Sequence, residues 1–235
     1  MPSSQLKEFR GRLTPERATL GINLAAKNAR RLASDARLLL EAERIPTAAS
    51  LAALSIEEAG KISILRGLVI EISETELKTE WRRYRDHRSK NGHWILPSLA
   101  AVGARTLGAF ANIANRDSEH TEILNTVKQL GIYSDCYGDN AHWSDPQVVV
   151  SRELADDLVK TAELLAPKKD VTVRELELWK KHLGPVWKTA EMSHALLRWA
   201  AAMHEEGLTE TTAADFEAFV FGTVSADSSP RRREH

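Results

Sequence analysis

Apolar residues recur at helical spacing along nearly the whole chain, and this periodicity restricts the fold more than any other feature of the sequence. From Leu20 to Leu40 they return every three or four residues, the pattern of a helix that buries one face. Thr14 and Pro15 predict the start of this helix, because a hydroxyl caps the first turn and proline suits the first helical position. Pro46 ends it, since proline cannot continue a helix.

The rest of the chain also reads as helices joined by loops. We expect helices over residues 15–42, 46–72, 75–92, 96–113, 118–130, 151–166, 173–183, 186–206 and 212–221. Residues 131–147 predict an irregular loop, and Val148–Val150 has strand propensity but is too short for a sheet. The prediction is therefore an all-α protein: an antiparallel helical bundle over 14–166, an additional C-terminal helical region over 167–222 and a disordered tail over 223–235.

Composition excludes several classes of protein. The chain of 235 residues carries 32 Lys and Arg against 33 Asp and Glu, so it is not basic throughout. Cys136 is its one cysteine, which excludes a disulfide framework and a four-thiolate zinc site, and the histidines lack metal-ligand spacing. Residues 1–17 lack the apolar core of a signal peptide, and no stretch reaches the roughly 18 apolar residues of a spanning helix. We expect a cytoplasmic protein with no membrane association, metal or cofactor.

The basic residues are concentrated in two segments. Residues 1–40 carry 8 basic and 3 acidic side chains, and residues 81–105 carry 6 and 1. Such blocks in an otherwise acidic chain indicate either a focused anion site or the ordinary solvated faces of amphipathic helices.

A carboxylate falls within the apolar stripe of the second predicted helix. Glu58 lies on this stripe in either helical register, between Leu54 and Leu65. A buried carboxylate needs a partner, which Lys61 or a basic residue of the third helix could supply. Glu58 then either supports a functional site or forms a structural ion pair between helices. Its neighbour Glu57 is expected to point to the side and to pair with Lys61 on the surface.

The third predicted helix contains two Arg-x4-His patterns, Arg82 with His87 and Arg88 with His93. Arginine holds phosphate oxygens, and histidine can take a proton from a ribose hydroxyl and return one to the leaving oxygen. The pair is therefore suited to metal-independent cleavage of RNA, although a solvated basic face gives the same pattern. Further candidates on this helix are Arg83, Arg85 and Lys90 for phosphate binding and Tyr84 as a supporting residue.

Four motifs in order resemble the HEPN domains of AbiV-type abortive-infection proteins over about residues 15–165. They are Asn28-Ala29 with Asp35-Ala36, Ile56-Glu57-Glu58-Ala59-Gly60-Lys61, His87-x2-Lys90, and Lys128-Gln129-Leu130-Gly131-Ile132-Tyr133-Ser134-Asp135. The resemblance implies a helical bundle, often a homodimer, that arrests growth in defence against phage. In the wider superfamily many members are metal-independent ribonucleases that use arginine and histidine.

Three functional hypotheses follow. In the first, the protein is a HEPN-type ribonuclease or toxin: His87 is the general base or acid, Arg82 and Arg88 bind the scissile phosphate, and Glu58 and Lys61 orient the basic helix. RNA is then the substrate, with a phage protein as a possible activator. In the second, the protein is a non-catalytic sensor of a phage component or sequesters a translation partner. In the third, it is a helical scaffold.

Overall fold

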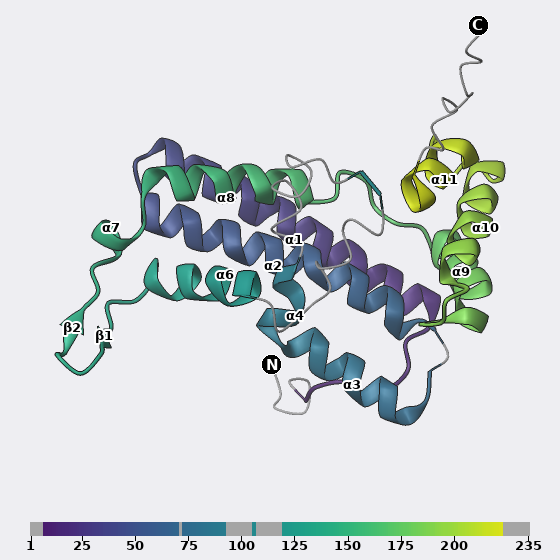
Figure 1. The fold of residues 1–235 in the computed structure, drawn as a ribbon, viewed down its shortest axis with the longest axis horizontal. Helices are drawn as coiled ribbons and strands as arrows, with labels where there is room; N and C mark the ends of the chain where they lie inside the picture. The colour runs from purple at the N-terminus through teal and green to yellow at the C-terminus, as the bar shows by residue number, and fades with distance from the viewer. Residues whose placement is uncertain (1–6, 71, 93–104, 107–118, 223–235) are drawn as a thin grey trace, which may run out of the picture.

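A pair of long antiparallel helices forms the framework of the protein (Figure 1). The computed structural model describes residues 7–70, 72–92, 105–106 and 119–222. Helix α1 spans Pro15–Glu41 and α2 spans Ile45–Leu68, joined by a turn in which Glu43 has a φ of 58°. Thr14 caps α1 as predicted, because its hydroxyl accepts a hydrogen bond from the Arg17 N–H at 3.3 Å.

Shorter helices pack around this pair. They are α3 (Glu74–Arg85), α4 (His87–Asn91), α6 (Glu119–Leu130), α7 (Pro146–Val149), α8 (Arg152–Leu165), α9 (Val173–Leu183), α10 (Met192–Glu205) and α11 (Ala213–Phe221). A 3-10 turn over Gly184–Val186 follows α9. A small antiparallel hairpin, β1 (Cys136–Tyr137) with β2 (His142–Trp143), projects from one end of the bundle in Figure 1. The predicted all-α bundle with further C-terminal helices is confirmed.

Helix α2 lies at the centre of the bundle and contacts α1, α3, α4, α6 and α8. Four fully buried alanines, Ala48, Ala49, Ala52 and Ala53, allow the neighbouring helices to approach closely. They belong to an apolar core that includes Leu158 of α8. Because several helices cover α2, it has no single apolar stripe that separates a buried face from a solvated one.

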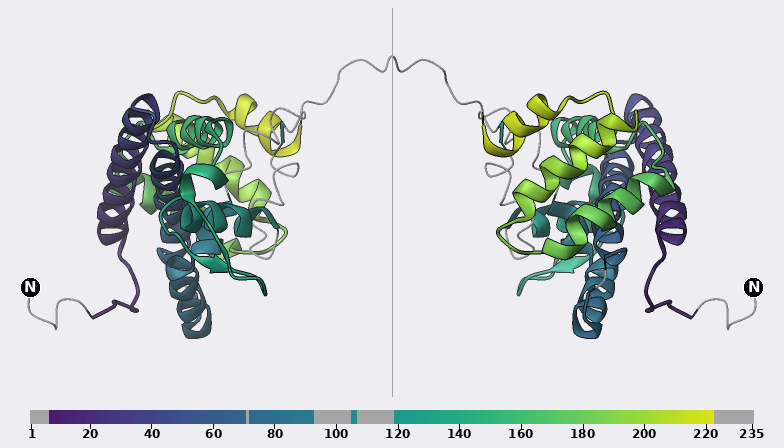
Figure 2. Two further views of the ribbon diagram at one scale, coloured as in Figure 1. Left: turned by 90° about the vertical axis from the view of Figure 1, so that its left-hand side faces the viewer. Right: turned by 90° about the vertical axis from the view of Figure 1, so that its right-hand side faces the viewer.

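A second apolar core lies where α1 begins and α2 ends. It joins Ile22 of α1 and Leu65 of α2 to Trp81 of α3 and to Leu176 and Leu183 of α9. The C-terminal helices face the viewer in the right-hand view of Figure 2, stacked at this end of the bundle. The division of the chain into separate units at residues 166 and 167 stays a prediction.

The structure differs from the predicted elements at several points. The third helix is interrupted at Asp86, whose backbone is extended (φ −78°, ψ 125°) and whose carboxylate accepts hydrogen bonds from the Ser89 N–H and hydroxyl at 3.0 and 2.7 Å. An aspartate that caps a new helix in this way competes with continuation of the old one. The segment 131–147, predicted as an irregular loop, contains the β1–β2 hairpin and the start of α7, and residues 148–150 form no strand, as their short length predicts. Arg105 and Thr106 are not helical, while the rest of 96–113 and the tail 223–235 lie outside the described residues.

We predict that Gly60→Ala destabilises the protein by about 3 kcal/mol, because a Cβ at Gly60 would lie 2.0 Å from the backbone oxygen of Lys90 and force α4 away from α2. Gly21→Ala in α1 is the matched control: its Cβ would meet only Leu65 at 3.6 Å, so alanine should stabilise the helix by about 0.5–1 kcal/mol. Urea denaturation of both variants measures the difference, and equal midpoints would contradict close packing of α4 on Gly60.

Candidate functional site

The candidate site is built around a buried carboxylate that contacts two other helices. Glu57 of α2 is 4 % exposed, and both of its oxygens have partners. Lys128 of α6 donates from Nζ to Oε1 at 2.7 Å, and His87 of α4 places Nδ1 2.8 Å from Oε2. Lys128 is itself buried, so its ammonium and the carboxylate compensate each other away from bulk water. One glutamate therefore ties α4 and α6 to α2.

The geometry assigns the proton on the His87 ring. Nδ1 lies 2.8 Å from a carboxylate oxygen and 3.3 Å from the Lys128 ammonium, which has no lone pair to offer. Nδ1 therefore carries a hydrogen and donates it to Glu57, and in the neutral form of the ring Nε2 has the lone pair. The His87 side chain is 56 % exposed, so this imidazole is held from within the bundle while it remains accessible to solvent.

Further cations lie beside this pair. Lys90 of α4 is buried; burial lowers its pKa, which attraction by Glu57 and Glu58 partly opposes and repulsion from Lys61 and Lys128 reinforces. Lys61 of α2 pairs with Glu58 at 2.5 Å and lies 5.6 Å from the centre of the Tyr84 ring. Three lysines thus surround two glutamates, a surplus of one positive charge even with His87 neutral. We call Glu57, Glu58, Lys61, His87, Lys90 and Lys128 the polar cluster.

Two glycines bring the three helices of the polar cluster together. The backbone of α4 crosses α2 at Gly60, where there is no room for a side chain. Gly131, directly after α6, lies against the start of α2, where a Cβ would be 2.3 Å from Ser50 Oγ. That hydroxyl lies 3.2 Å from the Lys128 carbonyl oxygen and fixes the end of α6. The side chains of the polar cluster come together because these two glycines let the helix backbones approach closely.

This arrangement agrees with the comparison to known families. A family model for HEPN domains, described as AbiV, matches residues 17–167. The chain belongs to the AbiV family. The match confirms the resemblance seen in the four sequence motifs, and it places the chain among abortive-infection proteins of HEPN type. No curated protein and no solved structure matches the chain.

Three of the AbiV motifs converge in the polar cluster. The second-helix motif supplies Glu57, Gly60 and Lys61, and the loop motif supplies Lys128 and Gly131. The His-x2-Lys motif places His87 and Lys90 on one turn of α4. The ordered motifs therefore mark the residues that join α2, α4 and α6.

The prediction that Glu58 is the buried carboxylate was wrong, and its neighbour Glu57 has that place. Glu58 is partly exposed and pairs with Lys61, one of the two partners predicted for it. The prediction that Glu57 pairs with Lys61 on the surface is wrong for the same reason. It assumed a single apolar stripe, whereas α2 is covered on several sides and the stripe does not identify the buried glutamate.

Arg82 does not join His87 in the polar cluster. It lies on α3, before the interruption at Asp86, and lines a pocket of about 360 Å³ with Arg10, Lys78, Trp81 and Arg85. His87 makes its contacts on α4 instead. The two residues of this Arg-x4-His pattern therefore lie on different helices and have different neighbours.

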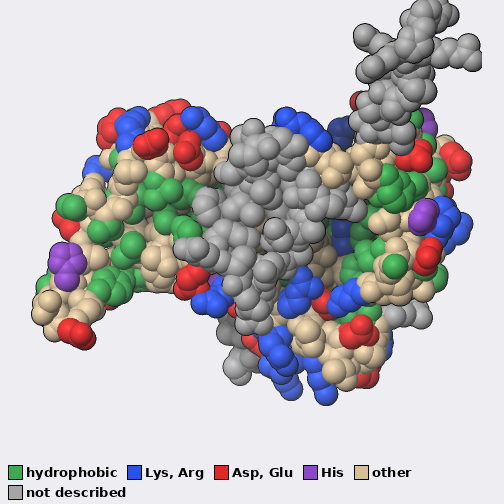
Figure 3. All heavy atoms as spheres, viewed as in Figure 1, with side chains coloured by type: hydrophobic (Ala, Val, Ile, Leu, Met, Phe, Trp, Pro, Cys, Tyr) green, Lys and Arg blue, Asp and Glu red, His purple; other side chains and the backbone are tan. Residues whose placement is uncertain are grey.

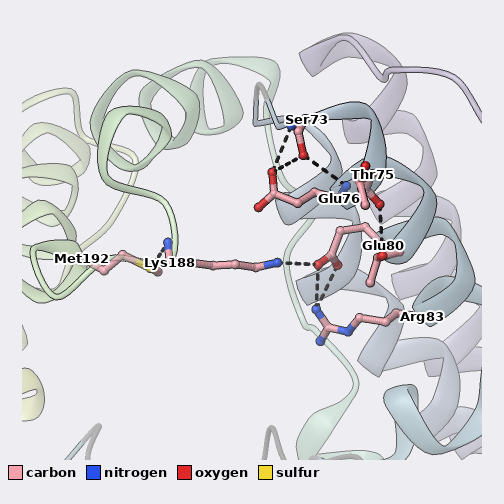
Figure 4. A network of polar contacts seen from close by, with 8 residues as sticks. Ser73, Thr75, Glu76, Glu80, Arg83, Lys188 and Met192 are labelled. Carbon is pink, nitrogen blue, oxygen red and sulfur yellow. Dashed lines mark hydrogen bonds and ion pairs between the residues drawn. The ribbon is translucent and has the colours of Figure 1, made fainter.

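Two other predicted phosphate ligands are engaged within the protein. Arg83 and Lys188 both point toward the carboxylate of Glu80 (Figure 4). Glu80 is 1 % exposed; Arg83 lies 2.9 Å from it, and Lys188, from the C-terminal region, lies 3.0 Å from it. Arg85 donates to the Phe9 carbonyl at 2.8 Å, pairs with Glu8 and so holds the N-terminal segment on α3. Both arginines have structural roles here.

The second Arg-x4-His pattern is only partly described. Arg88 of α4 pairs with Glu122 of α6 on the surface, next to the polar cluster. His93 lies outside the described residues. Across the described ranges, no group of three or more His, Cys, Asp or Glu is placed to hold a metal ion. In the same ranges, no helix has the length and apolar character to cross a membrane.

Sequence reasoning did not identify Glu57 and Lys128 as site residues. Lys128 was present in the quoted loop motif, and its position in an ordered set of motifs was the available signal. Helical spacing could not reveal it, because Lys128 and Glu57 are 71 positions apart and meet only through tertiary packing.

We predict that Glu57→Leu destabilises the protein by about 3–5 kcal/mol, because it leaves the buried ammonium of Lys128 without a carboxylate. Glu58→Gln removes the adjacent, partly exposed pair and should cost about 1 kcal/mol or less. Combining Glu57→Leu with Lys128→Met should restore most of the lost stability. Thermal and urea denaturation test this order; equal losses at Glu57 and Glu58 would contradict it.

Proposed function

We propose that this AbiV-family protein is a metal-independent ribonuclease of phage defence, with His87 as its general base and acid. The observation that carries the proposal is the Glu57–His87 pair, in which a buried carboxylate holds an exposed imidazole through Nδ1. A carboxylate in this position fixes the tautomer and stabilises the imidazolium formed when Nε2 accepts a proton. Cleavage of RNA would stop growth of the infected cell.

The chemistry follows from the free Nε2 lone pair. Nε2 takes the proton of a ribose 2′-hydroxyl, and the oxygen attacks the adjacent phosphorus. The bond from phosphorus to the 5′ oxygen breaks, and that oxygen takes up a proton from the imidazolium. The products are a 2′,3′-cyclic phosphate and a 5′-hydroxyl end. The step needs no metal, because histidine moves the proton and neighbouring cations stabilise the charge on the phosphate.

The polar cluster supplies cations for that phosphate. Lys90 and Lys61 lie beside the Glu57–His87 pair, and Arg88 follows His87 on the surface of α4. Arg82 belongs to the neighbouring basic pocket, where Lys78 and Arg10 add further charge. We assign this pocket to the RNA backbone beyond the scissile bond, since its contacts need only charge.

A second copy of the chain is the proposed partner. Large apolar side chains are exposed around the hairpin and α7, among them Tyr133 at 55 %, Trp143 at 68 % and Val148 at 79 %. Figure 3 shows hydrophobic side chains gathered over α6, α7 and α8 at this end of the molecule. Apolar patches of this kind mark contact surfaces, and homodimers are frequent among HEPN proteins. We propose that the dimer forms here, in the cytoplasm, and that a phage protein activates it.

One observation favours the non-catalytic alternative. Arg82 and His87 have different neighbours, so the arginine–histidine pair expected of a HEPN ribonuclease is not assembled at His87 in the described residues. The polar cluster would then hold a phosphate or an acidic group without cleaving it. In this reading the protein senses a phage component or sequesters a translation partner.

We predict that the purified protein cleaves total RNA in the presence of EDTA and that His87→Ala lowers the rate by about 10²–10⁴-fold, the usual contribution of a general base. His204→Ala is the matched control, because His204 is an exposed histidine of α10 far along the chain. End analysis should find 2′,3′-cyclic phosphates. Absence of cleavage by the dimeric wild type, or equal rates for both variants, would leave the non-catalytic alternative.

We predict that Trp143→Ser weakens self-association by about tenfold or more, as expected for a large aromatic residue at the centre of an interface. Leu24→Ser serves as the control, since Leu24 is an exposed apolar residue of α1, 58 % accessible, outside the proposed surface. Sedimentation velocity at several concentrations measures the dimer constant. The same constant for both variants would place the interface elsewhere.

A further inference from the structure

A cavity separate from the polar cluster lies between the paired helices and the C-terminal helices. Its volume is about 840 Å³, and its walls come from α1, α2, α9, α10 and the segment 167–171. Ile22, Ile62 and Leu196 give it a mostly apolar lining, and Trp179 and Trp187 supply two indole rings. Cavities of about 300–1,000 Å³ with apolar walls and a few polar groups are typical of small-molecule sites.

An arginine without a carboxylate partner lines this cavity. Across the described residues, no carboxylate lies within ion-pair distance of Arg66, and its guanidinium donates no hydrogen bond. It lies 5.6 Å from the centre of the Trp179 ring, an interaction that offsets part of its lost hydration. Burial lowers the pKa of Arg66, and the attraction of Glu175 from beyond contact distance only partly opposes this.

The hydration that Arg66 has lost indicates what kind of group the cavity could bind. Arginine stays charged in a protein, and the guanidinium of Arg66 is half-buried with no carboxylate beside it, so an anion in the cavity would replace hydration that the side chain has lost. The other charged side chains that line the cavity are also cations. Lys168 and Lys169 line its rim, and neither forms an ion pair with any described residue. Trp187 adds a buried indole N–H that has no acceptor among the described residues. Every unsatisfied group of the cavity is therefore a donor.

We propose that this cavity binds a small organic anion: a flat, largely apolar body that packs against Trp179 and Trp187 and carries a carboxylate or phosphate held by Arg66. The apolar walls would bury the body of such a ligand, and Lys168 and Lys169 would attract its charged end. The site is independent of the ribonuclease activity proposed for His87. It would place a ligand between α2 and the C-terminal helices, which are otherwise without an assigned role.

Two fluorescent probes of nearly equal shape test the proposal. Anilinonaphthalene sulfonate is an aromatic anion, and N-phenylnaphthylamine is its neutral counterpart. The full-length protein should bind the anion about tenfold more tightly than the neutral probe, the difference expected for one charge-assisted hydrogen bond. Naphthoate and naphthyl phosphate, used as competitors, then establish which anionic group is preferred.

Variants assign the binding to Arg66. Arg66→Met should weaken the anionic probe by about tenfold and change the neutral probe by less than about twofold, while Arg66→Lys should retain part of the preference. Ala59→Leu fills the cavity and should weaken both probes. Arg44→Met is the control, because Arg44 is an exposed arginine before α2 and does not line the cavity.

Three results would overturn the proposal. One is equal affinity of the wild type for the two probes, which needs no variant and so does not depend on whether Arg66→Met folds. Another is the same loss of anion binding in Arg44→Met as in Arg66→Met. The third is no measurable binding of either probe by the folded wild type.

Discussion

The ion pair between Glu57 and Lys128 is the interaction on which the arrangement of α2, α4 and α6 depends. Both side chains are buried, so neither can be satisfied by water if the other is displaced. The second oxygen of Glu57 is committed to His87, which fixes α4 over Gly60. Burying a charge in a helical bundle costs free energy unless the charge is paired. The partners of Glu57 therefore determine where α4 and α6 pack against α2.

The same helix serves two regions of different character. Toward α4 and α6, α2 presents glutamates and a lysine. About two turns beyond these glutamates it presents Arg66 to an apolar cavity between α2 and the C-terminal helices. Between its neighbours α2 is held by its buried alanines, which pack closely against α1 and α8. The central helix is a rigid support for groups that face in different directions.

Much of the fold could be predicted from the sequence. The predicted bounds of α1, α8 and α9 agree with the structure to within one residue at each end. Their first residues are marked by local signals, because Thr14, Ser151 and Thr172 each accept a hydrogen bond from a backbone N–H of the first turn. The interruption at Asp86 has a local cause too, but aspartate before a basic helix is also compatible with continuation. The C-terminal 186–206 helix is shorter than predicted, since α10 begins only at Met192, after Lys188 adopts a positive φ.

The candidate site was less predictable than the fold. His87, Lys90, Lys61 and Tyr84 were identified from residue type and motif, and the structure brings them near one another. The choice between Glu57 and Glu58 required knowledge of how many helices surround α2, which no local pattern contains. Arg82 was paired with His87 by counting residues along one helix. Asp86 divides that helix, and positions five apart on a helix would in any case lie about 140° apart around its axis.

The division at Asp86 also bears on how such sequences vary in length. Inside a continuous helix, one inserted residue turns everything that follows by about 100°, so a catalytic spacing would be locked to a single count. At a capped junction, an inserted residue would shift α3 but not α4. Helix α4 would still pack on Gly60, and His87 would still contact Glu57. The number of residues between α3 and His87 could then change without moving His87 away from Glu57. A residue that packs where His87 does is therefore better located by its contact with Glu57 and Gly60 of α2 than by counting from an arginine of α3.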